Sequence, residues 1–307
     1  MTEVLTVPNA RKSFRETRAL DGAALTLNRG ERLALLGPNS AGKTTLIRAI
    51  AGRVKLDQGT IRLLDQPLDA SSTTDVRQRL GIVPQEIGLY PLLTARENLQ
   101  VWGTLHGVSR GDLTDRTRWA LEWTGLSDRA EEPCKNFSGG MKRRLNIACA
   151  VLHRPDVILL DEPTVGVDPH SRQRIWDMLD ELREQGASLL LTTHQLDEAQ
   201  SICDRIVIID HGTVIAEGTF RELLADTIGT TRRVTFDIEG DVGDALHADG
   251  FESADGVLHH SLENVAVELP QMLKQIEKTG ARVQDLRIVA PSLQAVFIHL
   301  TGRELRE

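Results

Sequence analysis

The chain has 307 residues, a formal net charge of −8 at pH 7 and 26% charged residues. A chain of this length can bury a full core and is typical of two domains. The acidic balance argues against the basic surface that binds nucleic acid electrostatically. No apolar run approaches the ~20 residues that a membrane-spanning helix needs, so we expect a chain that is soluble by itself.

The start of the chain and its cysteines indicate the compartment. The first residues, Met1-Thr2-Glu3-Val4, lack the basic and then apolar layout of a secretory signal. The cysteines at positions 134, 149 and 203 are far apart and form no C-x-x-C pair. We therefore expect reduced, structural thiols in a cytoplasmic protein.

Short strands precede and follow a glycine-rich segment near the N-terminus. Residues 4–7 and 24–28 alternate apolar and polar side chains, which predicts strands, and a polar stretch containing Phe14 separates them. Residues 33–36 form an apolar run that predicts a buried strand, and residues 44–50 have the spacing of a helix.

The segment between that strand and that helix, GPNSAGKT, fits the P-loop pattern G-x-x-x-x-G-K-[ST] without a mismatch. Such a turn points backbone N–H groups at one place, where the helix dipole adds positive potential. Lys43 would reach the β- and γ-phosphates, and the Thr44 hydroxyl would ligate Mg²⁺. The segment predicts a nucleoside triphosphate site. Its residues are Gly37, Pro38, Asn39, Ser40, Ala41, Gly42, Lys43, Thr44 and Thr45.

Further along, a helical segment interrupts an α/β pattern. Residues 59–64 and 81–85 predict strands, the second ending at Gln85. From residue 94 to about 126 the spacing is helical and rich in tryptophan, with a break at 107–111. We interpret this stretch as a helical insert.

Strands and helices then alternate regularly. The predicted helices are 139–152, 169–185 and 196–201, and the predicted strands are 156–161, 187–193 and 205–210. This alternation implies crossover units and a largely parallel sheet. Functional residues of such a sheet lie at the carboxyl ends of its strands, where Gln85, Asp161, Glu162 and His194 stand.

Two of these motifs carry distinct chemistry. The strand that ends in Asp161-Glu162 places two carboxylates beside the P-loop, and we assign Asp161 to Mg²⁺ and Glu162 to the water that attacks the γ-phosphate. The segment SGGM at 138–141 begins a basic helix with free N–H groups and a capping hydroxyl. It is either an ordinary N-cap or a second anion site that closes over the γ-phosphate held by another copy.

After residue 225 the pattern changes. The predicted strands are 232–238, 256–260, 265–269 and 282–289, and the predicted helices are 242–248, 270–279 and 292–300. Pro270 and Pro291 stand where helices would start, and Gly280 where one would stop. This order is typical of a small two-layer α+β domain.

With these motifs, residues 1 to about 224 resemble the nucleotide-binding subunit of an ATP-binding-cassette (ABC) transporter. The corresponding motifs are Phe14 at the aromatic position that stacks on adenine, the P-loop at 37–44, Gln85 of the Q-loop, the signature Ser138, Gly139, Gly140 and Met141, the Walker B strand at 157–161, the following Glu162, the D-loop ending in Asp168, and the switch histidine His194.

The resemblance implies an α/β P-loop ABC ATPase with a mostly parallel sheet core, an antiparallel N-terminal β part and a helical insert at about 90–150. Residues 1–225 would form the nucleotide-binding domain and residues 226–307 an accessory α+β domain. Two copies would form a head-to-tail homodimer that sandwiches two ATP molecules between P-loop and signature. ATP closes such a dimer and hydrolysis reopens it, which moves an integral-membrane permease docked near the Q-loop and the insert. The subunit would lie peripherally on the cytoplasmic face of the membrane.

The resemblance also implies the roles of single residues. The implied catalytic residues are Lys43, Gln85, Glu162 and His194, and the implied Mg²⁺ ligands are Thr44, Gln85 and Asp161. Ser40 replaces the usual P-loop glycine, Met141 replaces the signature glutamine, and the D-loop lacks the usual Ser-Ala-Leu. None of these departures removes a catalytic group, so we predict an active ATPase.

The C-terminal segment 286–303 and residues 163–169 are similar to the bacterial drug-resistance branch of ABC exporters, the daunorubicin type. This implies an efflux subunit for a drug-like or hydrophobic substrate that pairs with a separate permease. Its tail would help two ATPase copies associate, or tune them. Two alternatives stay open: a soluble ABC ATPase that is not coupled to transport, and a module that holds ATP without turnover. Glu162 and His194 argue against the second.

Overall fold

The computed structural model describes residues 2–69, 72–240, 246, 250–254 and 257–302. The chain divides into two compact units, and the first passes into the second in sequence between Thr219 and Phe220. Helix α8 (Phe220–Asp226) contacts helix α11 (Leu293–Thr301) and so belongs with the second unit. The units therefore separate slightly before the predicted boundary at 225.

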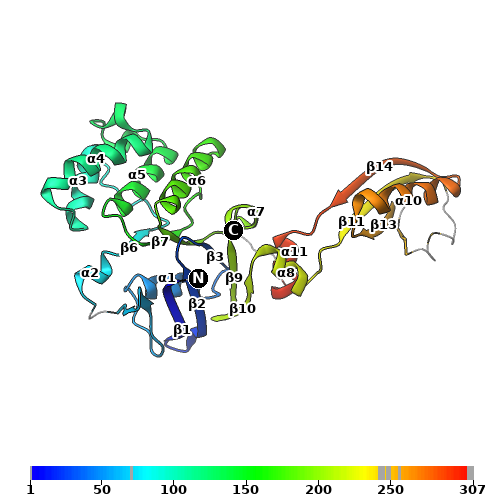
Figure 1. The fold of residues 1–307 in the computed structure, drawn as a ribbon, viewed down its shortest axis with the longest axis horizontal. Helices are drawn as coiled ribbons and strands as arrows, with labels where there is room; N and C mark the ends of the chain where they lie inside the picture. Colours follow the sequence, from blue (N-terminus) through cyan, green and yellow to red (C-terminus); the bar gives the residue numbers. More distant parts are fainter. Residues whose placement is uncertain (1, 70–71, 241–245, 247–249, 255–256, 303–307) are drawn as a thin grey trace. The chain divides into compact units, whose positions relative to one another are not determined.

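A six-stranded sheet in the order β10-β9-β3-β8-β7-β6 forms the centre of the first unit (Figure 1). Five strands run parallel, and β10 (Thr213–Gly218) pairs antiparallel at one edge. The parallel strands are β3 (Arg32–Leu36), β6 (Leu80–Val83), β7 (Val157–Asp161), β8 (Ser188–Thr192) and β9 (Arg205–Asp210). Every residue of β3 and β8 is buried, as expected of a sheet covered on both faces. The predicted α/β fold with a mostly parallel sheet is confirmed.

An antiparallel sheet covers one face of the parallel one. Its first two strands, β1 (Glu3–Phe14) and β2 (Thr17–Asn28), form a long hairpin, and the short β4 (Arg62–Leu63) and β5 (Gln66–Pro67) complete it. The polar stretch that separates the two predicted strands therefore belongs to the hairpin, because β1 continues to Phe14 and β2 begins at Thr17. One hydrophobic core joins this sheet to helix α1 (Lys43–Ile50) and to the parallel strands.

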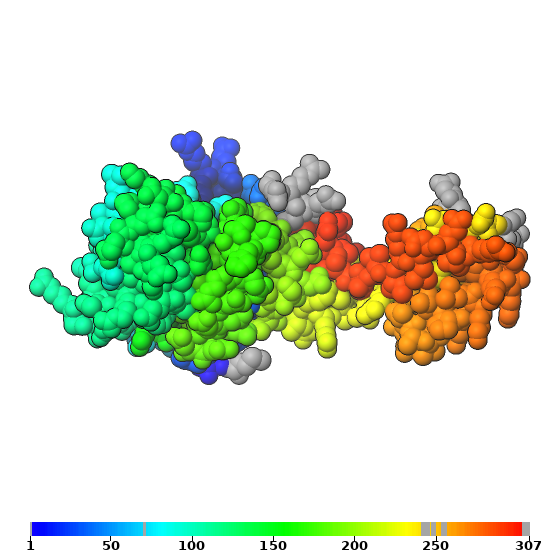
Figure 2. All heavy atoms as spheres, turned by 90° about the horizontal axis from the view of Figure 1, so that it is seen from above, coloured from blue at the N-terminus to red at the C-terminus, as the bar shows by residue number. Residues whose placement is uncertain are grey.

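The helical insert contains α3 (Ala95–Leu105) and α4 (Arg110–Thr124), and both pack on α5 (Gly139–Val151). Thr94 and Glu97 form a capping box at the start of α3, and α4 ends at a left-handed Gly125 with φ 65°. Helix α6 (Pro169–Glu184) contacts α5 and lies beside the insert in both views (Figures 1 and 2). Two short helices, α2 (Thr74–Arg77) and α7 (Leu196–Ile202), and two 3-10 turns, Ser127–Arg129 and Cys134–Asn136, complete the unit.

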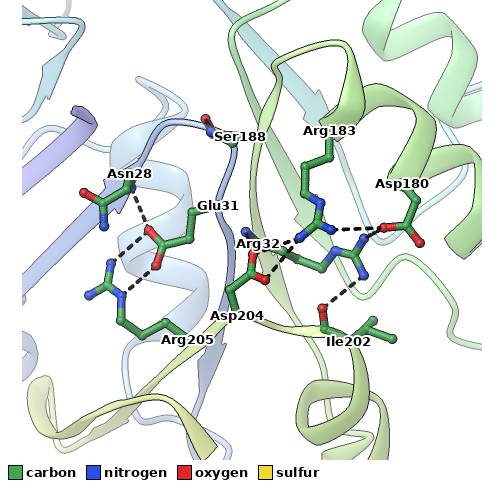
Figure 3. A network of polar contacts seen from close by, with 10 residues as sticks. Asn28, Glu31, Arg32, Asp180, Arg183, Ser188, Ile202, Asp204 and Arg205 are labelled. Carbon is green, nitrogen blue, oxygen red and sulfur yellow. Dashed lines mark hydrogen bonds and ion pairs between the residues drawn. The ribbon is translucent and has the colours of Figure 1, made fainter. Parts of the chain in front are cut away.

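A polar network lies at the amino ends of β3, β8 and β9 (Figure 3). Arg32 is 2% exposed; its side chain pairs with Asp180, and its backbone N–H donates to Asp204 at 2.8 Å. Glu31 accepts from Arg205 Nε at 2.7 Å. Ion pairs thus occupy the amino edge of the sheet, and the opposite, carboxyl edge carries the predicted site residues.

The second unit contains a four-stranded antiparallel sheet in the order β12-β13-β11-β14. Its strands are β11 (Arg232–Glu239), β12 (Glu252–Ala254), β13 (Val257–Leu262) and β14 (Arg282–Val289). Helix α10 (Val265–Lys278) packs on the sheet around a core that includes Val234, Phe236, Leu258 and Ile276.

The predicted strand at 265–269 is wrong, because these residues form the first turns of α10. The side chain of Asn264 caps the helix by accepting from the Ala266 N–H at 3.1 Å. Val265 and Leu269 then continue at helical spacing to Met272 on the core side. Pro270 accordingly lies inside the helix and not at its start. The strand β12 was not predicted, and the predicted helix at 242–248 lies, apart from Leu246, outside the described residues.

All three cysteines lie in the described part of the chain and are free. Burial raises the pKa of Cys134 to about 11 and that of Cys203 to about 12. These thiols stay protonated near neutral pH, as structural cysteines do. Among the residues that the structure describes, no helix combines the length and apolar character needed to cross a bilayer.

A stacked histidine pair, His106 at the end of α3 and His153 after α5, should make the protein sensitive to acid. The rings of His106 and His153 stack with centroids 4.4 Å apart, and burial, followed by the charge of His106, lowers the pKa of His153 from 6.5 to about 4. The unfolded chain therefore binds more protons between these two pH values. We expect the free energy of unfolding to fall as pH drops through this window, by up to about 3 kcal/mol.

This pH dependence can be measured by urea unfolding at pH 7.5 and pH 5. His153→Phe keeps a stacking ring but cannot titrate, so its loss of stability between the two pH values should be smaller. An unchanged dependence in His153→Phe would contradict the assignment.

Candidate functional site

The P-loop connects β3 to α1. At two of its glycines the surrounding backbone leaves no room for a side chain. A Cβ atom at Gly37 would lie 2.2 Å from the carbonyl oxygen of Ile209. Gly42, the N-cap of α1, has φ +110°. Only glycine satisfies either requirement. Ser40 has φ 67°, a left-handed conformation that costs a non-glycine residue roughly 1–2 kcal/mol, which agrees with glycine being usual here.

A cavity of about 430 Å³ opens beside this loop. Its lining combines residues 39–45 of the loop and of α1 with side chains from the carboxyl ends of β6, β7 and β8 and with part of β2. The side chains from outside the loop are Thr17, Ala19, Gln85, Asp161, Glu162 and His194. Residues predicted from separate segments of the sequence thus lie around one space.

Lys43 is the buried cation of the cavity, with 8% exposure. Its Nζ donates to the carbonyl oxygens of Gly37 and Pro38, the latter at 3.0 Å. Burial lowers the pKa of Lys43, and the carboxylates of Glu162 and Asp161 oppose this effect. These carbonyls hold the ammonium group at the wall of the cavity.

Glu162 lies at the centre of the polar side chains. Its carboxylate accepts from Gln85 Nε2 at 2.9 Å and lies 2.7 Å from His194 Nε2. Within the described residues His194 Nδ1 is buried and has no hydrogen-bond partner. In neutral His194 we therefore assign the proton to Nε2, which donates to Glu162. Glu162 has φ 48°, so its backbone adopts the strained left-handed region.

Asp161, Thr44 and Gln85 carry oxygen atoms of the kind that ligate a divalent cation. Thr192 Oγ1 donates to Asp161 Oδ1 at 2.6 Å and so orients this carboxylate. The three predicted ligands line the main cavity and also a second one of about 220 Å³ next to it. Carboxylate, hydroxyl and amide oxygens with few protein ligands are the set that Mg²⁺ takes when phosphates complete its shell, so these residues fit the ion.

The remaining predicted residues lie outside the cavity. Phe14 is 48% exposed and pairs in the hairpin with Thr17, which does line the cavity. Ser138 caps α5 by accepting from the Met141 N–H at 3.3 Å, and both Ser138 and Gly139 are exposed. The chain therefore does not bring the signature to its own P-loop.

The signature lies instead against the start of α6. A Cβ atom at Gly140 would lie 2.3 Å from Ser171 Oγ, so only glycine fits between the two helices. Asp168 caps α6 by accepting from the Ser171 N–H at 2.9 Å, and this hydrogen bond lowers the pKa of Asp168. The signature and the D-loop are neighbours in one chain.

Four residues at or next to the site were missed by sequence reasoning. Thr192 and the pair Thr17 and Ala19 could have been inferred, because Thr192 ends an apolar strand and residues two apart share one face of a strand. Arg143 gave no such signal. It lies on α5 with 2% exposure and donates to the carbonyl oxygens of Pro84 and Glu162.

This geometry defines a P-loop ATPase, and comparison with known proteins gives its class. The ABC transporter family matches residues 20–165. The linearmycin resistance ATP-binding protein LnrL of Bacillus subtilis is 37% identical over 99% of this chain and 100% of its own length. The chain belongs to the ABC transporter family and is an ATP-binding subunit that hydrolyses ATP to power transport.

Other relatives also match over nearly the whole chain. The Nod factor export ATP-binding protein I of Ralstonia nicotianae is 35% identical over 100% of this chain and 96% of its own. The daunorubicin/doxorubicin resistance ATP-binding protein DrrA of Streptomyces peucetius is 36% identical over 95% and 90%. A solved ATP-binding subunit of an ABC transporter matches with a TM-score of 0.67 at 31% identity, covering 73% of this chain and 92% of that one. A dimeric ATP-binding cassette bound to ADP and Pi matches at 0.63 and 26%, covering 71% and 99%.

Proposed function

We propose that this chain powers the export of a drug-like or hydrophobic molecule through a separate integral-membrane permease. The observation that carries the proposal is the similarity along the whole chain, second unit included, to ATP-binding proteins named for drug resistance and for export. The two solved cassettes described above cover 73% and 71% of the chain. The likeness to exporters is thus more than a likeness between ATPase cores.

We further propose that two copies act as a head-to-tail dimer. Ser138 and Gly139 are exposed at the start of α5 and lie outside their own chain's cavity, which is open beside the P-loop. A helix N-terminus with a hydroxyl group suits the γ-phosphate of a neighbouring copy. Gly140 and Met141 continue the same turn, and Asp168 lies next to it. The dimeric relative bound to ADP and Pi supports this assembly.

In the proposed reaction the P-loop N–H groups and Lys43 hold the phosphates of ATP, and the ring of Phe14 stacks on adenine. Thr44, Gln85 and Asp161 would hold Mg²⁺, which would neutralise charge on the β- and γ-phosphates. Glu162 orients the attacking water and accepts its proton as the bond to the γ-phosphorus forms and the bond to the ADP oxygen breaks. His194 holds Glu162 from the other side.

The proposed contact with the permease lies beside Gln85 and on the insert. Apolar side chains are exposed directly after Gln85, among them Ile87, Tyr90 and Leu92 with exposures of 39%, 47% and 76%. A groove of about 670 Å³ on α3 and α4 continues from Leu93 to Leu113. Contact there would place the chain peripherally on the cytoplasmic face of the membrane and would transmit changes at Gln85.

The test is affinity purification of the tagged chain from native membranes, followed by reconstitution of the co-purifying proteins in vesicles. We expect one integral-membrane protein, whose substrate stimulates ATP turnover and accumulates in inside-out vesicles. Leu92→Asp should reduce co-purification, whereas Val267→Asp, at an exposed position of the second unit, should not. Recovery of ribosomes or DNA without any membrane protein would support the uncoupled ATPase and contradict the proposal.

A further inference from the structure

The cationic side chain of Arg143 is buried and donates hydrogen bonds to two uncharged backbone carbonyl groups. Its NH1 donates to the carbonyl oxygen of Pro84 and its NH2 to that of Glu162, each at 2.8 Å. The side chain is 2% exposed. Burial lowers the pKa of Arg143, and the fields of Asp161 and Glu162 oppose this effect. The guanidinium stays charged there, as arginine does in proteins, and the two nearby carboxylates stabilise its charge.

The two carbonyl groups belong to peptide bonds of two predicted catalytic residues, Gln85 and Glu162. That of Pro84 is in the peptide that precedes Gln85, and that of Glu162 is in the peptide that follows Glu162. The Glu162 N–H is held from the other side by the hydroxyl and carbonyl oxygens of Thr192, both at 3.2 Å. Glu162 keeps its left-handed φ of 48° between these two anchors. Strained backbone of this kind persists only where the surroundings over-determine it.

We propose that Arg143 is a positioning residue that, from the signature helix α5, holds Gln85 and Glu162 at hydrogen-bond distance and so couples the signature to the hydrolytic carboxylate of the same chain. A planar guanidinium can donate in two fixed directions at once, which a lysine cannot. If the signature engages ATP in a second copy, α5 transmits its position to Glu162 through this side chain. The inference rests on the proposed role of Glu162.

The test compares Arg143→Met and Arg143→Lys with a matched control, Arg116 on the neighbouring helix α4. Arg116 also donates to a carbonyl at one end of α5, that of Leu152 at 2.7 Å, but lies away from the cavity. We expect Arg143→Met to lower kcat on the order of 10²-fold, as a misplaced catalytic group does. KM for ATP should stay within about 2-fold, because binding is not the step affected. Arg143→Lys should be impaired too, and Arg116→Met should not.

A purely structural role is excluded by two further readouts. Turnover is expressed per bound ATP in single-turnover assays, so a fraction of unfolded protein does not count as lower kcat. In the Glu162→Gln background Arg143→Met should cause no additional loss, since both changes remove the same function. An equal loss in Arg143→Met and Arg116→Met, a raised KM alone, or a multiplied loss in the double variant would overturn the inference. Wild-type turnover in Glu162→Gln would instead overturn the proposed role of Glu162.

Discussion

Replacing Glu162 with glutamine should lower ATP turnover by about 10²- to 10⁴-fold while ATP is still bound, the range lost when a general base is removed. The carboxylate accepts from Gln85 at 2.9 Å and faces His194 at 2.7 Å. A glutamine has one oxygen and one NH2 group, so it can accept from one of these neighbours only and cannot take a proton from water.

Phosphate release measures the turnover of Glu162→Gln, and analytical ultracentrifugation measures its assembly. With ATP and Mg²⁺ the variant should sediment as a stable dimer, because the step that reopens the dimer is blocked. Glu122→Gln, which neutralises an exposed carboxylate on α4, should behave as the wild type. Turnover near the wild-type rate would show that Glu162 does not orient the water.

Replacing Lys43 with alanine should impair ATP binding and hydrolysis together. Lys43 is the buried ammonium group of the cavity lining, held on the Gly37 and Pro38 carbonyls beside Asp161 and Glu162. Its loss leaves two carboxylates facing the phosphates without this positive charge. We expect turnover to fall on the order of 10²- to 10³-fold, as when a group that stabilises developing charge is removed.

The affinity of Lys43→Ala is measured by titration with a fluorescent ATP analogue. The dissociation constant should rise by about 10-fold or more, which corresponds to a loss of 1.4 kcal/mol or more, and this separates the variant from Glu162→Gln. Lys55→Ala, at an exposed position beyond α1, is the control for a lost positive charge. Thermal unfolding verifies that both variants are folded. Wild-type affinity in Lys43→Ala would contradict the phosphate role.

Local patterns predicted most of the nucleotide-binding unit. The P-loop glycines stand in a short segment with a recognisable pattern, although the backbone atoms that require them belong to Ile209 and Ala19 of distant strands. The residues at strand ends converge because parallel strands end at one edge. The ABC ATPase assignment is confirmed by the family match and the full-length relatives. The roles of Glu162, His194 and the signature stay predictions, although the structure brings Glu162 and His194 to 2.7 Å.

What the sequence did not predict depends on contacts between distant segments. Arg143 looks like one of several basic residues on α5, and only the fold brings it to Pro84 and Glu162. The strand predicted at 265–269 failed for a local reason. Its apolar residues suit a strand as well as a helix, and the Asn264 cap decides for the helix.

The close contact between Gly140 and Ser171 has a consequence for kinetics. Because the Ser171 side chain on α6 lies directly against Gly140 on α5, a displacement of one turn cannot leave the other in place. In a dimer, the first turn of α5 would face the nucleotide of the neighbouring copy. Arg143, on the same helix, contacts residues beside the nucleotide site of its own chain. ATP bound at either site would then change the geometry of the other site. The two sites would hydrolyse ATP cooperatively and not independently.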